Sequence, residues 1–178
     1  MKKMRKFALI IGRFQPFHLG HLSLVKRYNK AGYFCKIAIG SSQKNFEKDN
    51  PLTIQEREEI IKRVMKEFKI KDFKVYFVPD INDEKNYVKH ILKIVGKFDV
   101  LITGNSKLLK LFLKYKTKSF DIESFEEPFA RPGGKISSGV IRKRWLKKND
   151  RLGLPKSAFN YLKSIGFSER LKEISKKN

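Results

Sequence analysis

The sequence has 178 residues and a mass of 20.9 kDa, which fits one ordinary domain and is too short for two sizeable ones. Its composition, 40% hydrophobic with 15 Phe but only 11 Gly and 6 Pro, excludes a collagen-like or wholly disordered chain, and it has no run of about eighteen apolar residues that could span a membrane. A single cysteine, Cys35, excludes an intramolecular disulfide and favours the cytoplasm, while 41 Lys and Arg against 18 Asp and Glu give a formal charge of +23 that attracts anions.

Short apolar runs alternate with helical stretches along the chain, which is typical of βαβ units in a parallel α/β sheet. Thr53 with Glu56 three residues later has the form of a capping box at a helix start. In chain order the patterns predict a strand at 7–12, a helix from 19 to about 31, a strand at 36–40, a helix at 53–68, a strand at 73–78, a helix at 83–95, a strand at 99–103, a helix at 108–115 and a strand at 118–122.

After a loop over residues 126–135, which holds two Pro and two Gly, the C-terminal part is predicted to be helical, with Gly153 and Pro155 separating two helices. Trp145 is expected to anchor the core of this part. The predicted organisation is one domain over residues 1–144 and a small helical extension over 145–178 that packs on it.

Residues 12–21, Gly-Arg-Phe-Gln-Pro-Phe-His-Leu-Gly-His, follow the first strand, where parallel α/β sheets bind ligands. His18 and His21 would lie beside the N-terminus of the first helix, whose dipole and free N–H groups favour anions. Gly20 removes a side chain that would block a phosphate, and Arg13 offers a planar fork of donors to phosphate oxygens. The alternative is that His18 packs at the turn and Gly20 only allows the chain to reverse.

A second motif, Ile-Ser-Ser-Gly-Val-Ile-Arg at residues 136–142, enters the first C-terminal helix. Ser137 and Ser138 can cap that helix and donate to phosphate oxygens, and Arg142 would point at the same anion. Capping alone is the alternative for both serines.

Together the two motifs resemble the nucleotidyltransferase superfamily that carries the His-x-Gly-His signature. The flanking residues are similar to the archaeal type of nicotinamide-nucleotide (NMN) adenylyltransferase, and the similarity covers roughly residues 7–144. The resemblance implies a Rossmann-like sheet flanked by helices. The segments that carry it are residues 13–17, 40–44, 50–53 with Glu56 and Arg57, 79–82 and 103–105.

The resemblance implies transfer of AMP from ATP to NMN, giving NAD and pyrophosphate by direct attack of the NMN phosphate. The spacing of His18 and His21 is not that of a helical zinc site, and no third ligand is evident. The expected divalent ion is therefore Mg²⁺, held largely by ATP oxygens and water. Relatives of this type form oligomers, so a homo-oligomer is expected.

Residue roles follow from the same resemblance. His18 and His21 would contact the ATP phosphates, with His21 acting on the transition state, and Lys44 would reach the reacting phosphates unless it is an ordinary surface lysine. Arg13 and Arg142 would brace the β- and γ-phosphates, and Ser137 and Ser138 would add donors. Substrate-binding roles are also expected for Gly12 and Gly20 in the first motif, for Gly104 and Asn105 near the adenosine, and for Phe14, Asn82 and Tyr87 in the NMN pocket.

Two positions depart from the family pattern: Tyr87, where the family usually has Trp, and Gly139, where relatives commonly carry Thr. Tyr can still stack on a cationic pyridinium ring, although Tyr87 could equally belong to the core. His90 is interpreted as structural.

Two alternatives remain open. One is an enzyme of the same superfamily with another phosphate acceptor, such as nicotinic acid mononucleotide, FMN, pantetheine phosphate or an alcohol phosphate with CTP. The other is a basic nucleic-acid-binding protein, which the +23 charge would suit but for which no recognisable binding motif exists.

Overall fold

The computed structural model describes residues 4–115, 120–124, 130–131, 134–148, 150–151 and 153–177. It contains two compact units, each made of three segments. The first unit holds Met1–Gly12, Leu24–Ser42 and Asp72–Glu126, and the second holds Arg13–Ser23, Gln43–Lys71 and Glu127–Asn178. Among the described residues, no helix combines the length and apolarity needed to cross a membrane.

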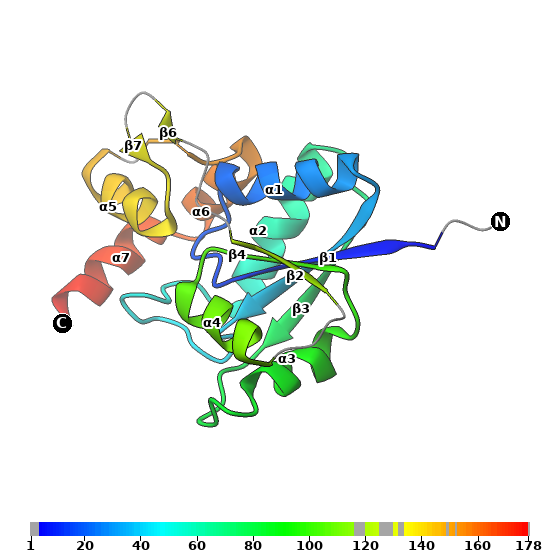
Figure 1. The fold of residues 1–178 in the computed structure, drawn as a ribbon. Coiled ribbons are helices and arrows are strands. Elements are labelled where there is room, and N and C mark those ends of the chain that lie inside the picture. Colours follow the sequence, from blue (N-terminus) through cyan, green and yellow to red (C-terminus); the bar gives the residue numbers. More distant parts are fainter. Residues whose placement is uncertain are drawn as a thin grey trace. The chain divides into compact units, whose positions relative to one another are not determined.

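A five-stranded parallel sheet is the framework of the first unit (Figure 1). Its strands are β1 (Lys6–Gly12), β2 (Tyr33–Gly40), β3 (Phe73–Val78), β4 (Val100–Thr103) and β5 (Asp121–Ser124), in the order β3-β2-β1-β4-β5. β1 is central, with Ile10 opposite Ile37 on one side and Ile102 on the other. The strand order reverses between β1 and β4, as in a Rossmann-like sheet, so the predicted α/β class is confirmed.

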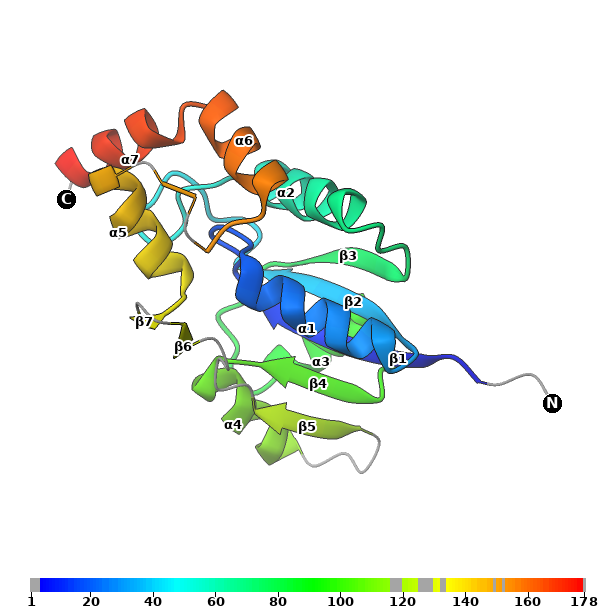
Figure 2. The same ribbon diagram turned by 90° about the horizontal axis from the view of Figure 1, so that it is seen from above.

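Helices cover both faces of this sheet. α3 (Tyr87–Val95) and α4 (Ser106–Tyr115) pack on the face that carries Leu9 and Ile11. On the opposite face lies α1 (Leu19–Lys30), seen in front of β1 and β2 in Figure 2. Within the first unit, Asn29 of α1 donates from Nδ2 to the Tyr33 carbonyl at 3.1 Å, which fixes the helix to the start of β2.

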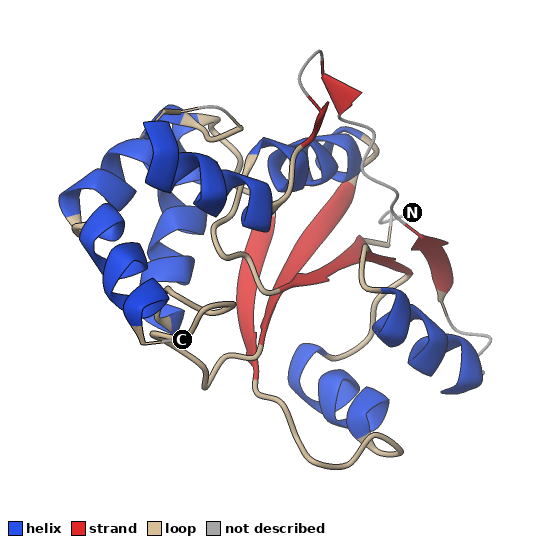
Figure 3. Ribbon diagram, turned by 90° about the vertical axis from the view of Figure 1, so that its left-hand side faces the viewer, coloured by secondary structure: helices blue, strands red, loops and turns tan. Residues whose placement is uncertain are grey.

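The second unit holds the start of α1 and the whole of α2 (Ile54–Glu67), α5 (Ser138–Lys148), α6 (Lys156–Ser164) and α7 (Phe167–Lys176). Helices are drawn in blue in Figure 3. The predicted capping box is present, because Thr53 Oγ1 accepts from Glu56 N at 3.2 Å and Glu56 Oε2 accepts from Thr53 N at 2.9 Å. Trp145 is buried against Phe159 and Phe167, as predicted for a core anchor, and donates from Nε1 to Ser168 Oγ at 2.8 Å.

Most predicted elements are found within a few residues of their expected limits, with four differences. The helix expected from residue 83 begins at Tyr87, because Asp83 accepts hydrogen bonds from the backbone and side-chain nitrogens of Asn86 and closes a turn first. The strand expected at 118–122 runs over Asp121–Ser124, and residues 118 and 119 lie outside the described residues.

Gly153 and Pro155 lie between two helices as predicted, but among the described residues the C-terminal part has three helices rather than two. α6 and α7 are separate since Gly166 between them adopts a left-handed conformation with φ of 65°, which glycine reaches without strain. In the expected loop over 126–135, the described residues form a short antiparallel pair, β6 (Ala130–Arg131) and β7 (Gly134–Lys135).

Candidate active site

The loop after β1 carries the first predicted motif, and its second residue is strained. Phe14 has φ of 50°, a conformation uncommon for a residue other than glycine. Its ring is buried, 5.6 Å from the Phe17 ring and 4.8 Å from the His21 ring, which it meets edge-on. The structure therefore places Phe14 as a support for His21, and its contact with NMN stays a prediction.

The two motif histidines stack on each other, with ring centroids 3.7 Å apart. His21 Nδ1 accepts from His18 N at 3.2 Å, and His18 Nδ1 accepts from Gly20 N at 3.2 Å. Because both Nδ1 atoms act as acceptors, each neutral imidazole carries its proton on Nε2.

Burial keeps both histidines neutral near pH 7. It lowers the pKa of His18 to about 3, and burial followed by the charge of His18 lowers the pKa of His21 well below its ordinary value. The pair therefore offers two Nε2–H donors rather than two fixed charges.

Gly20 has a structural reason to lack a side chain. A Cβ atom at this position would lie 3.0 Å from Cε1 and 3.1 Å from Nδ1 of His18, closer than ordinary contacts. The absent side chain thus leaves room for the imidazole, which is a structural alternative, and the role of Gly20 in phosphate binding stays a prediction. The N–H groups expected to be free at the helix start are also partly engaged, since Leu19 N donates to Gly153 O at 2.9 Å and Gly20 N to His18.

The second motif meets the first, as the sequence predicts for two parts of one anion site. Arg142 donates from Nη1 to the Gln15 carbonyl at 2.8 Å and forms a 3.4 Å ion pair with Asp49 through Nη2. Burial lowers the pKa of Arg142, Asp49 raises it, and the nearby charge of Arg13 lowers it further. Two arginines are therefore held close enough to repel each other, which is an arrangement that a bound polyanion would relieve.

The two serines of this motif have structural partners. Ser137 Oγ accepts from Val140 N at 3.3 Å and caps α5, while Ser138 Oγ donates to the Pro16 carbonyl at 3.0 Å. At Gly139 a Cβ atom would have only one ordinary contact, 3.9 Å from Ser137 Oγ, so this departure from the family pattern leaves space and removes no structural contact. The phosphate contacts of both serines stay predictions.

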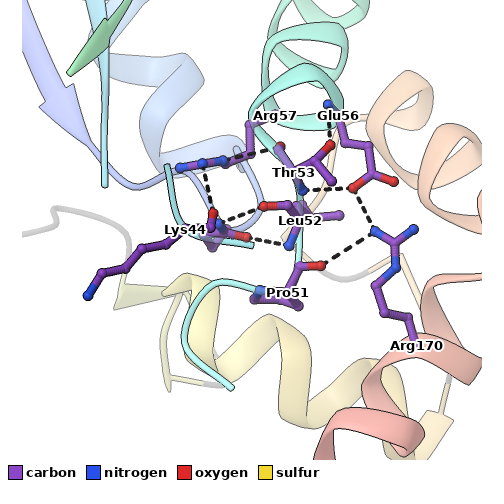
Figure 4. A network of polar contacts seen from close by, with 8 residues as sticks. Lys44, Pro51, Leu52, Thr53, Glu56, Arg57 and Arg170 are labelled. Carbon is purple, nitrogen blue, oxygen red and sulfur yellow. Dashed lines mark hydrogen bonds and ion pairs between the residues drawn. The ribbon is translucent and has the colours of Figure 1, made fainter. Parts of the chain in front are cut away.

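A buried polar network holds the loop between β2 and α2 (Figure 4). The Gln15 side chain pairs with both backbone groups of Leu52, donating to its carbonyl at 3.1 Å and accepting from its N–H at 2.9 Å. Arg57, 0% exposed, donates from Nη1 to the Arg13 carbonyl at 3.3 Å and from Nη2 to the Lys44 carbonyl at 3.2 Å. The exposed Lys44 side chain extends away from Arg57.

Neither Gln15 nor Arg57 was assigned a role by sequence reasoning. A signal for Arg57 exists, because it shares the apolar face of α2 with Ile60, Ile61 and Val64, where a charged residue is out of place. For Gln15, which pairs across 37 residues of chain, we find no local signal.

α7 contributes a second arginine to this network. Arg170 donates from Nη1 to Glu56 Oε2 at 2.6 Å and to the Pro51 carbonyl at 3.4 Å, and its guanidinium lies over the Phe46 ring. Burial would raise the pKa of Glu56, but the hydrogen bonds from Arg170 and from Thr53 N lower it overall. The capping box of α2 is thereby tied to the C-terminal helices.

Of the residues predicted for the acceptor pocket, Asn82 and Tyr87 belong to the first unit and Phe14 to the second. Asp80 Oδ1 accepts from Ser41 Oγ at 3.2 Å and from Tyr87 OH at 3.5 Å. Burial, followed by the charge of Asp80, raises the pKa of Tyr87 to about 12. Asn82 is exposed, and His90 has the structural contact expected of it, 3.0 Å from the Pro79 carbonyl.

Gly12, predicted to bind substrate, and Gly104 and Asn105, predicted to lie near the adenosine, are found at or just after strand ends of the first unit. Gly12 ends β1, and Gly104 follows β4, at the point where the strand order reverses. Asn105 Oδ1 accepts from Lys107 N at 3.0 Å and Leu108 N at 3.2 Å, so its side chain caps α4. Its adenosine contact stays a prediction.

Solved structures share this fold. The bifunctional NMN adenylyltransferase/ADP ribose pyrophosphatase of Francisella tularensis, in complex with AMP and a Mn ion, matches 96% of the chain with a TM-score of 0.74 and 16% identity. A second structure of that protein matches 98% of the chain with a TM-score of 0.75 and 17% identity. The chain spans about half of their length, 52% and 54%.

Sequence comparisons are more specific. The cytidylyltransferase-like family model matches residues 9–144. The nicotinamide-nucleotide adenylyltransferase of Methanolobus tindarius is 35% identical over 95% of this chain and 94% of its own, and that of Methanococcus aeolicus is 33% identical over 96% of both. The relative of Archaeoglobus fulgidus with the same name is 32% identical over 94% of this chain and 97% of its own. The chain therefore belongs to the cytidylyltransferase-like family and, within it, to the nicotinamide-nucleotide adenylyltransferases, as the resemblance predicted.

Proposed function

We propose that this chain transfers AMP from ATP to NMN, giving NAD and pyrophosphate. An NMN phosphate oxygen attacks the α-phosphorus, and the bond from that phosphorus to the pyrophosphate oxygen breaks in line. The observation that supports this most strongly is the contact between the two motifs, which brings Arg142 onto the loop of Arg13 and the paired histidines.

The roles proposed for the second unit are electrostatic. The NMN phosphate is already an anion near pH 7, so the step needs no general base, and the neutral His18 and His21 suit donation from Nε2–H to phosphate oxygens. Arg13 and Arg142 would neutralise charge on the departing pyrophosphate, with Lys44 at the reacting phosphates. Each well-placed donor is typically worth about 10²–10³ in rate.

Mg²⁺ is proposed to enter with ATP. The side chains gathered around His21 and Arg142 are mainly cations and N–H donors, and the carboxylate of Asp49 is paired with Arg142, so the set fits phosphate rather than a metal ion. Within the ranges that the structure describes, no three His, Cys, Asp or Glu side chains are grouped to hold a metal ion. A Mg²⁺ ion held by phosphate oxygens and water would supply further neutralisation of the leaving group.

NMN is proposed as the preferred acceptor over nicotinic acid mononucleotide. Asp80, which accepts from Tyr87 and Ser41, places a carboxylate among the residues expected to bind the pyridinium ring. Such a charge attracts the cationic ring of NMN and repels the additional carboxylate of the acid.

Three other features stay predictions: a homo-oligomer, a cytoplasmic location, and a domain over residues 1–144 followed by an extension over 145–178. Light scattering on the purified protein measures the first directly. For the third, residue 144 lies within α5, so a truncation test should end before Ser138 rather than at the predicted boundary.

The proposed function is tested with purified protein, ATP, Mg²⁺ and either acceptor, following dinucleotide and pyrophosphate. NAD formed from NMN, and lost in His21→Ala, would support the proposal. ATP binding without product from either acceptor would refute the NAD assignment. A nucleic-acid-binding protein would instead show nucleic-acid affinity that falls about 10³–10⁵-fold between about 50 and 200 mM salt.

A further inference from the structure

We propose that Arg57 is a positioning residue that fixes the backbone of Arg13 and Lys44, two of the cations proposed to act on ATP. Arg57 does not itself reach a ligand, because its side chain is 0% exposed. The inference rests on the proposed function for the roles of Arg13 and Lys44, whereas the contacts of Arg57 are independent of it.

The guanidinium joins three separate stretches of the second unit. Its Nη1 donates to the Arg13 carbonyl at 3.3 Å, its Nη2 to the Lys44 carbonyl at 3.2 Å, and its Nε to the Thr53 carbonyl at 3.2 Å. The first lies just after β1, the second in the loop after β2, and the third at the capped start of α2. A rigid fork of donors can hold several carbonyls at once, and the shorter, single-point ammonium of lysine cannot.

Burial makes this arrangement sensitive to geometry. A buried cation is tolerated only where its donors are satisfied, so the carbonyls must stay where Arg57 needs them. The residue is fixed on α2, whose first turn is held by the capping box of Thr53 and Glu56. The positions of both loop carbonyls are thereby set by a helix rather than by the loops themselves.

The consequence for the reaction concerns the side chains of Arg13 and Lys44, whose backbone carbonyls Arg57 holds. Arg13 and Lys44 are both exposed and reach outward from backbone that Arg57 anchors. A loss of these anchors would widen the range of positions that their charges occupy, and charge stabilisation depends on placement within about 1 Å. Substitution of Arg57 should therefore change ATP binding and turnover but leave the binding of NMN unchanged.

The test uses the full-length protein with Arg57→Lys, which keeps the charge, and Arg57→Met, which fills the same apolar face of α2 without charge. Arg63→Lys is the matched control, because Arg63 lies on the same helix, pairs with Glu59 at the surface and contacts none of the three carbonyls named above. Calorimetry with α,β-methylene-ATP measures the ATP side without turnover, and steady-state kinetics give kcat and the KM for each substrate.

In both Arg57 variants we expect the Kd for the analogue to rise about tenfold and kcat to fall about tenfold, while the KM for NMN changes by less than about twofold. All three values should be unchanged in Arg63→Lys. A tenfold change corresponds to about 1.4 kcal/mol, the scale of one hydrogen bond from a charged group. In an Arg13→Ala/Lys44→Ala background the effect of Arg57→Lys on the Kd should shrink to within twofold, because Arg57 acts through those residues.

Several results would overturn the proposal. An unchanged Kd with a lowered melting temperature, or failure of both Arg57 variants to fold, would show that Arg57 serves the fold alone. An undiminished effect in the Arg13→Ala/Lys44→Ala background would show that Arg57 does not act through those two residues. If the unaltered chain binds the analogue but makes no NAD, the proposed function fails while the Arg57 comparison still stands. No binding of the analogue by the unaltered chain would refute both.

Discussion

Replacing Gly20 by alanine tests whether the histidine pair must be held in its stacked arrangement. The added Cβ atom would lie 3.0 Å from Cε1 and 3.1 Å from Nδ1 of His18. Ordinary contacts between such atoms are about 3.5–4.0 Å, so the imidazole must move by about 0.5–1 Å. It cannot move away without disturbing His21, whose ring centroid is 3.7 Å away, and it loses the hydrogen bond from Gly20 N.

The expected magnitude differs between activity and stability. A displacement of about 1 Å at groups that act on the transition state costs up to about 10²-fold in rate, so kcat/KM for NAD formation should fall about 30- to 100-fold. Stability should change by no more than about 1 kcal/mol, because the gain of replacing a helical glycine by alanine, about 0.5–1 kcal/mol, offsets the lost hydrogen bond of about 1 kcal/mol.

Gly139→Ala is the control for this measurement. Gly139 is the second residue of α5, as Gly20 is of α1, but its Cβ atom would have a single ordinary contact at 3.9 Å. Steady-state kinetics and thermal melting of both variants should show loss of activity in Gly20→Ala alone. Equal activity of the two variants, or an equal loss in both, would refute the reasoning.

Three further predictions concern single charges. Asp49→Asn removes a carboxylate, 67% exposed, that competes with phosphate for Arg142, so the KM for ATP should fall about two- to threefold, and a rise would contradict the competition. Asp80→Asn keeps a hydrogen-bond acceptor for Tyr87 but removes the negative charge. The ratio of kcat/KM for nicotinic acid mononucleotide to kcat/KM for NMN, measured in a paired assay, should then rise about tenfold. An unchanged ratio would show that Asp80 does not select between the two substrates. The pKa of His18 is lowered to about 3, so between about pH 6.5 and 3 the unfolded chain binds a proton that the folded chain does not. The free energy of unfolding should therefore fall by up to about 1.4 kcal/mol for each unit that the pH drops in this range. In His18→Asn, the free energy of unfolding, measured with urea at several pH values, should depend less steeply on pH.

The parts of the fold that the sequence predicted are those specified by local pattern. Alternation and apolar periodicity located the strands and helices, and Thr53 with Glu56 located the start of α2 to the residue. The first motif was assigned to a ligand site because of its place after β1, and this follows from how parallel sheets are built. Gly166, by contrast, was not recognised as a helix break, because an isolated glycine in a helical pattern is often tolerated.

The parts of the site that could not be predicted depend on pairing across long stretches of chain. Leu19 N donates to Gly153 O, and Arg142 donates to the carbonyl of Gln15, in each case across more than a hundred residues. Backbone groups take part in these bonds, and a backbone carbonyl has the same chemistry at every position. Residue type therefore carries no signal for them, and only the folded arrangement shows which carbonyl is used.

The partners that hold the arginines also explain how the site keeps its positive field. Arg57 is held by the carbonyls of Arg13, Lys44 and Thr53, and Arg142 by that of Gln15. A carbonyl orients a guanidinium without cancelling its charge, whereas a buried carboxylate would neutralise it before ATP arrives. The acidic partner of Arg142, Asp49, is itself largely exposed, so water screens the ion pair and the proposed triphosphate contact would displace only a weakly held carboxylate. Orientation by carbonyls thus meets two demands that conflict in most buried ion pairs: Arg57 is fixed without a counter-charge that would weaken the local positive field, and Arg142 keeps its charge for the proposed contact with substrate.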